Sequence, residues 1–498
     1  MNKHKHFFIF ILTMTYENRI VRFFYELDKQ NINECQTQLH FLLRTLKNDF
    51  YKGGPTDIIC LNLLRTLYSM IGYTRDIYSG RGERDLSYMM ISVWYQYFPV
   101  LAIYAFSRFV FSKDSNNSYG CWNDIKYFCK YIHKSSPKGW NDPLINIAVS
   151  FANRQLNKDI ENREHSSNVA KWIPKESKNR WLYEKFVTKW FDVYEKDPTV
   201  YDFSFQKKKY RNILSKHNRE LNPDSLKTNR NIIRGIHTGS HYTKTKNHSF
   251  GKTFFHDNIF IGTYIKTAVS LLERATDNAD TMCDMIWLNQ KWSRLCASFE
   301  NILSSFPLVN ISREVSDENL FHALGFACLI ASKSDVKRIL LISNEPIWID
   351  VSDCNDFCKM IERVWSFCEY RAHSIVSNTI DVLMKNIEYS NVCNFQMFVF
   401  SDNFEKEWRE LHDIPGRKFS IVYWKLGHTD IYDDNKTQMD FTKSIVMNGH
   451  SACLLRFFTG CLVCGEQTEC AYSFICRIMN DYRYQPLSEY FDLFCKNI

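Results

Sequence analysis

The spacing of apolar residues changes once along this chain, close to residue 304, and this change limits the folds that the chain can adopt. From Tyr16 to about Leu303, apolar residues recur three and four positions apart, which is typical of amphipathic helices. From Phe306 onward, short apolar runs alternate with helical patterns, which predicts a doubly wound parallel sheet. The sequence therefore predicts a multidomain α plus α/β protein.

We expect four segments along the chain. Residues 1–15 form an apolar segment that is either disordered or not translated, since Met14 offers a second start. This segment resembles the core of a signal peptide but lacks a small-residue cleavage site, so we do not expect secretion. The predicted domains are a helical domain, 16–303, an α/β domain, 304–467, and C-terminal helices, 468–498.

Within the helical domain, short polar turns separate the helical patterns, so we expect antiparallel helix pairs stacked as in HEAT-like solenoids. The longest apolar stretch, Tyr88 to Phe111, is long enough to span a bilayer, but Pro99 divides it. Because proline interrupts a helix, we expect two buried helices and no membrane span.

A basic, polar stretch interrupts the helical domain between residues 206 and 252. Mobile cations can follow a phosphate backbone, so one interpretation is an RNA-binding segment. The alternative is a solvated, disordered insertion. The candidate RNA contacts in this stretch are Lys207, Lys208, Lys209, Arg211, Lys216 and Arg219.

The segment SGRGERD, residues 79–85, places glycines and arginines just before a predicted helix. Its backbone N–H groups and nearby guanidinium groups could meet a phosphate, although the Gly-Lys-Ser/Thr ending of a nucleotide-binding loop is missing. The candidate phosphate contacts are Arg75, Arg81 and Arg84. The alternative is a structural ion-pair network that joins Arg75 and Arg84 to Asp76, Glu83 and Asp85.

The first predicted strand, FPLVNIS, ends at Asn310 in a loop of small and polar residues. In a von Willebrand factor A domain, the corresponding strand ends in Asp-x-Ser-x-Ser, a later loop supplies a Thr, and the fourth strand supplies an Asp to a divalent cation. This chain resembles that arrangement, and the matching positions are Asn310, Ser312, Glu314, Ser377 and Asp402. Because Asn310 offers a neutral carbonyl where a carboxylate is expected, the resemblance implies a degenerate site that binds Mg²⁺ weakly or hydrogen-bonds internally.

Four motifs of the helical half resemble those of a family found in plants, bacteria and large DNA viruses. They are YTRDIYSGRGERDL, SYGCWNDIKYF, VAKWIPKES and YRNILSKHNRELN. That family pairs a TROVE-like helical region, as in the Ro autoantigen that binds misfolded and small structured RNAs, with a C-terminal von Willebrand factor A domain. The resemblance covers about Tyr73 to Gly460 and departs at Cys121, where the family tends to have Arg. It implies a TROVE-like solenoid, then a Rossmann-like A domain, and RNA binding by analogy.

The sequence contains no nucleophile elbow, Walker loop or His-Glu-x-x-His zinc helix, so we expect no enzyme and no cofactor beyond weakly bound Mg²⁺. Its 17 cysteines are an odd number scattered through predicted helices and strands, which favours a reduced, cytoplasmic protein, in host cytoplasm or virion if viral. "KWIP" and "CWND" predict that Trp172 and Trp122 are buried between helices.

We expect a non-enzymatic binding protein with RNA as its leading partner, since the net charge of +8 mildly favours an anionic ligand. The alternative is a protein-interaction or virion-associated scaffold whose A domain docks a protein partner. The position of the basic residues distinguishes the RNA-binding interpretation from the scaffold interpretation. RNA binding requires the Lys207 to Lys252 segment and the arginines near Arg81 to share one face, whereas a scaffold would show apolar patches there.

Overall fold

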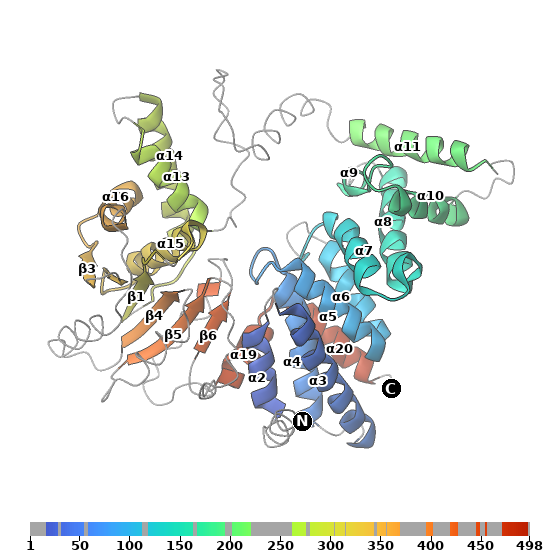
Figure 1. Ribbon diagram of the computed structural model, residues 1–498, viewed down its shortest axis with the longest axis horizontal. Coiled ribbons are helices and arrows are strands. Elements are labelled where there is room, and N and C mark those ends of the chain that lie inside the picture. The colour runs from blue at the N-terminus through green and yellow to red at the C-terminus, as the bar shows by residue number, and fades with distance from the viewer. Residues whose placement is uncertain are drawn as a thin grey trace. The chain divides into compact units, whose positions relative to one another are not determined.

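A computed structural model describes most of the chain (Figure 1). The described residues are 16–27, 31–53, 58–111, 118–162, 167–194, 202–220, 261–274, 279–302, 304–313, 315–342, 346–354, 356–368, 395–401, 419–426, 445–448, 454–455 and 471–496. The apolar N-terminal segment and most of the basic stretch, residues 221–252, lie outside them. Contacts divide the chain into two compact units: the first unit is residues 1–82 with 251–498, and the second unit is residues 83–250.

The second unit consists of helices that pack mainly against near neighbours in the sequence. They are α5 (Arg84–Tyr97), α6 (Pro99–Val110), α7 (Asn123–Ser135), η2 (Gly139–Asn141), α8 (Pro143–Glu161), α9 (Val169–Trp172), α10 (Arg180–Tyr194) and α11 (Phe203–Glu220). Pro99 occupies the first turn of α6, where its missing N–H breaks no helical hydrogen bond. The long apolar stretch therefore forms two helices, and Trp94 and Phe109 on them are fully buried.

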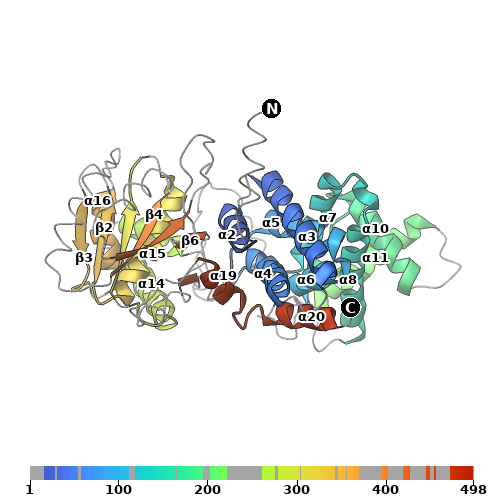
Figure 2. The ribbon, with the colours of Figure 1, turned by 90° about the horizontal axis from the view of Figure 1, so that it is seen from below.

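In the first unit, helices from the two ends of the chain pack together. The N-terminal helices are α2 (Tyr16–Glu26), α3 (Ile32–Gly53) and α4 (Ile58–Arg75), and the C-terminal helices are α19 (Ala471–Met479) and α20 (Gln485–Lys496). Both α19 and α20 pack against α4, and α19 also contacts α2 (Figures 1 and 2). The rings of Tyr68 on α4 and Phe491 on α20 have centroids 5.9 Å apart. The C-terminal helices thus complete an apolar core with the N-terminal ones.

The first unit also contains a six-stranded sheet with the order β3-β2-β1-β4-β5-β6. Its strands are β1 (Ser305–Asn310), β2 (Arg338–Ile342), β3 (Ile347–Asp350), β4 (Phe395–Ser401), β5 (Phe419–Lys425) and β6 (Ile445–Asn448). The α plus α/β class is confirmed. The prediction of a wholly parallel sheet is wrong at one edge, because β3 pairs antiparallel with β2. Residues 343–346 alone link these two strands, which is too short for the helical crossover that parallel pairing requires.

Among the described residues, the helices that accompany the sheet are α13 (Gly262–Leu272), α14 (Ala279–Ala297), α15 (Asp317–Lys333) and α16 (Phe357–Cys368). The Ser316 side chain caps α15 by accepting a hydrogen bond from the Asn319 N–H. α15 packs on β1 and β2, α13 packs on α15 and α16, and α14 packs on α16. The structure thus groups α13 and α14 with the sheet, whereas the sequence placed them in the helical domain, because their apolar faces meet α15 and α16.

The contact between α13 and α15 depends on two small residues. A Cβ added at Gly325 would lie 3.0 Å from both Cγ atoms of Ile261, and one added at Gly262 would lie 2.9 Å from Nδ1 of His322. Overpacking costs about 1–3 kcal/mol and alanine gains about 1 kcal/mol over glycine inside a helix, so we expect Gly325→Ala to lower the free energy of unfolding by up to about 2 kcal/mol. Urea unfolding measures this, with Glu318→Gln on the exposed first turn of α15 as the control. A gain in stability would mean that Ile261 does not pack closely against Gly325.

Among the helices in the described part of the chain, none is long and apolar enough to cross a membrane.

Candidate functional site

The loop that follows α4 turns its backbone N–H groups toward the end of that helix. Gly80 and Gly82 donate to the Asp76 carbonyl at 3.2 and 3.1 Å, and Arg81 N–H donates to the Tyr73 carbonyl at 3.0 Å. Gly82 has φ 72°, and a Cβ at Gly80 would lie 2.1 Å from the Tyr73 oxygen, so both positions need glycine. These amides satisfy the carbonyls at the end of α4. The three amides are therefore already engaged within the turn, which favours a structural role for this loop over a phosphate cradle.

The arginines of the same segment have different surroundings. Arg75 is fully buried and donates to the Gly82 carbonyl at 3.4 Å, so its guanidinium group is not available to a phosphate. Arg81 is half-buried and donates to the Leu27 carbonyl at 2.6 Å. Arg84, in the second unit, is exposed. Of the three candidates, Arg84 is thus the one with a solvent-facing charge.

An ion pair does stabilise this region, but its basic member is a residue that the sequence interpretation did not include. Asp76 is fully buried and receives hydrogen bonds from Arg483, from Nε at 2.8 Å and from a terminal guanidinium nitrogen at 2.9 Å. The Tyr484 hydroxyl donates to the same carboxylate at 3.3 Å. The pair connects the end of α4 to the turn between α19 and α20.

The first part of the basic stretch is a docked helix rather than a solvated insertion. Residues 206–220 belong to α11, whose inner face includes Tyr210 and His217. The Tyr210 hydroxyl donates to Oδ1 of Asn153 on α8 at 2.7 Å. His217 lies 3.6 Å from the buried carboxylate of Asp159 on the same helix. The helix is thus fixed to α8 by the Tyr210 hydrogen bond, and His217 is buried beside the same helix. Both residues lie in the stretch for which the sequence left RNA binding open.

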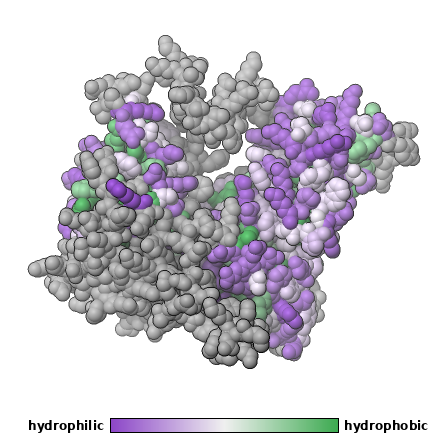
Figure 3. Space-filling view, viewed as in Figure 1, coloured by the Kyte–Doolittle hydropathy of each residue, from purple (hydrophilic) through white to green (hydrophobic). Residues whose placement is uncertain are grey.

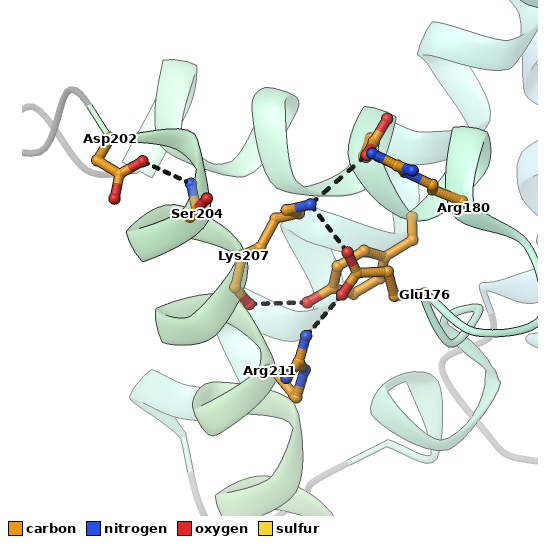
Figure 4. Close-up of polar contacts among 8 residues, drawn as sticks. Glu176, Arg180, Asp202, Ser204, Lys207 and Arg211 are labelled. Atoms are coloured by element: carbon orange, nitrogen blue, oxygen red, sulfur yellow. Dashed lines mark hydrogen bonds and ion pairs between the residues drawn. The ribbon is translucent and has the colours of Figure 1, made fainter.

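Two of the candidate RNA contacts on α11 hold this helix in place (Figure 4). Lys207 Nζ lies 2.9 Å from Glu176 and 3.7 Å from Glu184, and Arg211 lies 2.6 Å from Glu176. The hydrogen bond from Lys207 is the main reason that the pKa of Glu176 is lower than usual. The Tyr183 hydroxyl adds a bond to the Lys207 carbonyl at 2.9 Å. Lys207 and Arg211 are therefore largely neutralised by carboxylates.

The outer face of α11 carries the remaining cations of that set. Lys208, Lys216 and Arg219 are exposed, and Lys209 is half-buried. Lys208 and Arg219 are about three helical turns apart, so their side chains lie on one face. Residues 203–219 of α11 include no Asp or Glu, so this face is positively charged.

Cations and aromatic rings also gather on α7 and α9, together with Arg84 at the start of α5. Of these residues, Arg84 alone is among the candidate RNA contacts predicted from the sequence. Lys126 Nζ lies 4.7 Å from the ring centroid of Tyr127 and 5.8 Å from that of Trp172. Arg84 and Lys130 lie 4.8 and 6.0 Å from the Tyr127 ring, and Lys171 lies 5.5 Å from the Trp172 ring. We call these residues the cation–aromatic cluster: Arg84, Lys126, Tyr127, Lys130, Lys171 and Trp172.

A sequence signal for this cluster does exist. Lys126 and Lys130 are four residues apart in NDIKYFCKYIHK, so both lie on one face of the helix with Tyr127 beside them.

The two tryptophans that the sequence predicted to be buried between helices are only partly buried. Trp172 and Trp122 are both half-buried, and the Trp122 ring packs edge-on against the Phe111 ring with centroids 5.2 Å apart.

The predicted metal loop is described only at its first two positions. Asn310 and Ser312 are buried, and the Asn310 side-chain oxygen accepts a hydrogen bond from the Ser312 N–H at 2.8 Å. The Ser312 hydroxyl is buried without a partner among the described residues. Glu314, Ser377 and Asp402 lie outside the described residues. Weak Mg²⁺ binding therefore stays a prediction, and Asn310 is already engaged as an internal acceptor.

No model of a known protein family matches the chain, and neither a curated protein nor a solved structure is significantly similar to it.

Proposed function

We propose that the chain is a non-enzymatic RNA-binding protein and that the second unit makes the contacts. The observation that carries the proposal is the outer face of α11, where Lys208, Lys216 and Arg219 are exposed without acidic residues among positions 203–219. Side chains of this kind release condensed counterions when they meet phosphates, which favours binding to any RNA backbone. The visible face of the unit that holds α7 to α11 is mostly hydrophilic (Figure 3).

We also propose that the α/β part is a von Willebrand factor A-like domain and that the helices are TROVE-like and solenoid-like. The strand order β3-β2-β1-β4-β5-β6, with an antiparallel edge strand, supports the first part of this proposal. The packing of helices against near neighbours in the second unit supports the second part. The required common face of α11 and Arg81 stays a prediction, because these residues belong to different units.

A salt titration tests the RNA proposal. We expect the logarithm of affinity for single-stranded RNA to fall linearly with the logarithm of salt concentration, by about 0.7 per phosphate contact. Changing Lys208, Lys216 and Arg219 to Gln should lower that slope by about 2 and weaken binding equally for unrelated sequences, because phosphate contacts do not specify sequence. Filter binding across a salt series measures both effects.

The matched control removes three exposed cations from the first unit: Lys266, Arg294 and Lys359, each changed to Gln. Both triple variants lose the same net charge, so only the α11 variant should change the slope. If the two variants behave alike, the α11 face does not contact RNA. The scaffold alternative then gains weight, because the first turn of α11 also exposes Phe203 and Phe205, at 37% and 50% of their surfaces.

A further inference from the structure

The cation–aromatic cluster combines two features that a nucleic-acid site needs. Tyr127 on α7 is 37% exposed, and Trp172 on α9 is half-buried. The Lys126 ammonium is within cation–π distance of both rings, so the two rings are neighbours across α7 and α9. Aromatic surface and positive charge are thus accessible at one place.

The charges of the cluster repel one another. Partial burial lowers the pKa of Lys126, and the nearby cations Lys130, Arg84 and Lys178 lower it further, opposed by Tyr127. The acidic residue in the first turn of α7, Asp124, is fully buried and accepts hydrogen bonds from the Tyr88 hydroxyl and the Cys121 N–H. It is therefore committed to the helix start. A bound anion would relieve the repulsion among the cations.

We propose that the cation–aromatic cluster binds an unpaired segment of single-stranded RNA, with a base stacked on Tyr127 or Trp172 and the adjoining phosphates on Lys126, Lys130 and Lys171. This inference rests on the proposed RNA-binding function and names the form of RNA that the second unit selects. Bases in a duplex are already stacked and present only their edges. Exposed aromatic rings therefore favour the binding of single-stranded RNA over duplex RNA.

The contacts within the cluster do not prevent such stacking. Each cation–π contact at an exposed ring is weak, and stacking of a base on an aromatic side chain contributes more, roughly tenfold in affinity. A displaced ammonium group keeps a partner, because the phosphate that enters with the base replaces the ring. Replacing the cation–π contacts with base stacking and phosphate contacts therefore favours RNA binding.

The cluster is also joined to the basic face of the proposed function through one short helix. α9 packs against both α7 and α11, and the Asn218 side chain of α11 donates to the Ala170 carbonyl of α9 at 3.3 Å. Stacking at the cluster and phosphate contacts on α11 thus belong to the same compact unit, and a single titration can separate their contributions.

Ring substitutions test the proposal. Binding of a short fluorescent polyuridine strand and of an RNA duplex of the same length is measured by anisotropy for the full chain and for Tyr127→Leu, Trp172→Leu and the double variant. We expect each leucine to weaken single-strand binding by about tenfold while the salt slope stays unchanged, because the rings carry no charge. Duplex binding should change little. Tyr127→Phe and Trp172→Phe keep a stacking surface and should bind like the unaltered protein.

The other outcomes separate failure of the cluster proposal from failure of the proposed RNA-binding function. If leucine variants with unchanged melting temperature bind the single strand normally, the cluster is a structural feature and the inference is overturned, while RNA binding stands. If single-strand and duplex binding fall equally, the cluster does not select unpaired bases and the inference is again wrong. If the unaltered protein binds neither RNA, the proposed function itself fails. Because Tyr127 is exposed, its variants test the proposal even if Trp172→Leu fails to fold.

Discussion

Replacing Arg483 with alanine should destabilise the first unit by about 3–5 kcal/mol, one of the two largest effects that we expect from a single substitution in this protein. The reason is the environment of its partner. Asp76 is fully buried, and Arg483 gives it two hydrogen bonds, at 2.8 and 2.9 Å. Without Arg483 the carboxylate would remain in the interior without its compensating charge. Calorimetric unfolding of the full chain measures the loss.

The control is Arg338→Ala. Arg338 pairs with Asp350 at 3.4 Å, but both side chains are about half exposed, at 52% and 51%. Solvent screens such a pair, so this substitution should cost no more than about 1 kcal/mol. A double variant, Asp76→Asn with Arg483→Met, should be more stable than Arg483→Ala, because it removes both charges together. Equal stability losses for Arg483→Ala and Arg338→Ala would show that the Asp76 pair is solvated.

This ion pair also marks a limit of sequence reasoning. Asp76 does form an ion pair, as a buried carboxylate requires, but with Arg483, which the predicted network of Arg75, Asp76, Glu83, Arg84 and Asp85 did not include. Its partner is separated from it by 407 residues. Nothing in the local pattern around Asp76 identifies Arg483, because the pairing depends on how α19 and α20 pack against α4.

Local patterns were sufficient where local chemistry decides the structure. Pro99 divides an apolar run into two helices because proline is tolerated in the first turn of a helix and not inside one. The period of the apolar residues predicted β1 and α15, and Ser316 marks the start of α15. The same reasoning missed the antiparallel β3, since the pattern of a strand does not state its direction.

The candidate site was harder to predict because charge alone does not distinguish a ligand contact from a helix anchor. Lys207 and Arg211 look the same in sequence as Lys208 and Lys216, yet the first two are paired with Glu176. Which cations remain solvent-facing depends on which face of α11 packs inward. That face is set by Tyr210.

Replacing Trp424 with alanine should destabilise the α/β part by about 3–5 kcal/mol, because it leaves a large cavity in the core. Trp424 on β5 is fully buried, with its ring centroid 4.4 Å from that of Phe326 on α15 and 5.6 Å from that of Phe400 on β4. Calorimetry of the full chain measures the loss. The control is Phe367→Ala on α16, whose ring is 39% exposed and should cost much less.

The thermal unfolding transition that Trp424→Ala shifts also tells whether the sheet and the helices around α4 unfold together. Contacts place Trp424 and Arg483 in one compact unit, whereas the sequence put a domain boundary near residue 304 and separated the C-terminal helices. A unit that unfolds cooperatively shows one transition, and any destabilising substitution within it moves that transition. If Trp424→Ala and Arg483→Ala lower the same transition temperature, the first unit unfolds as one body. If they move two different transitions, the sheet and the helices around α4 fold independently, and the boundary near residue 304 is the real one.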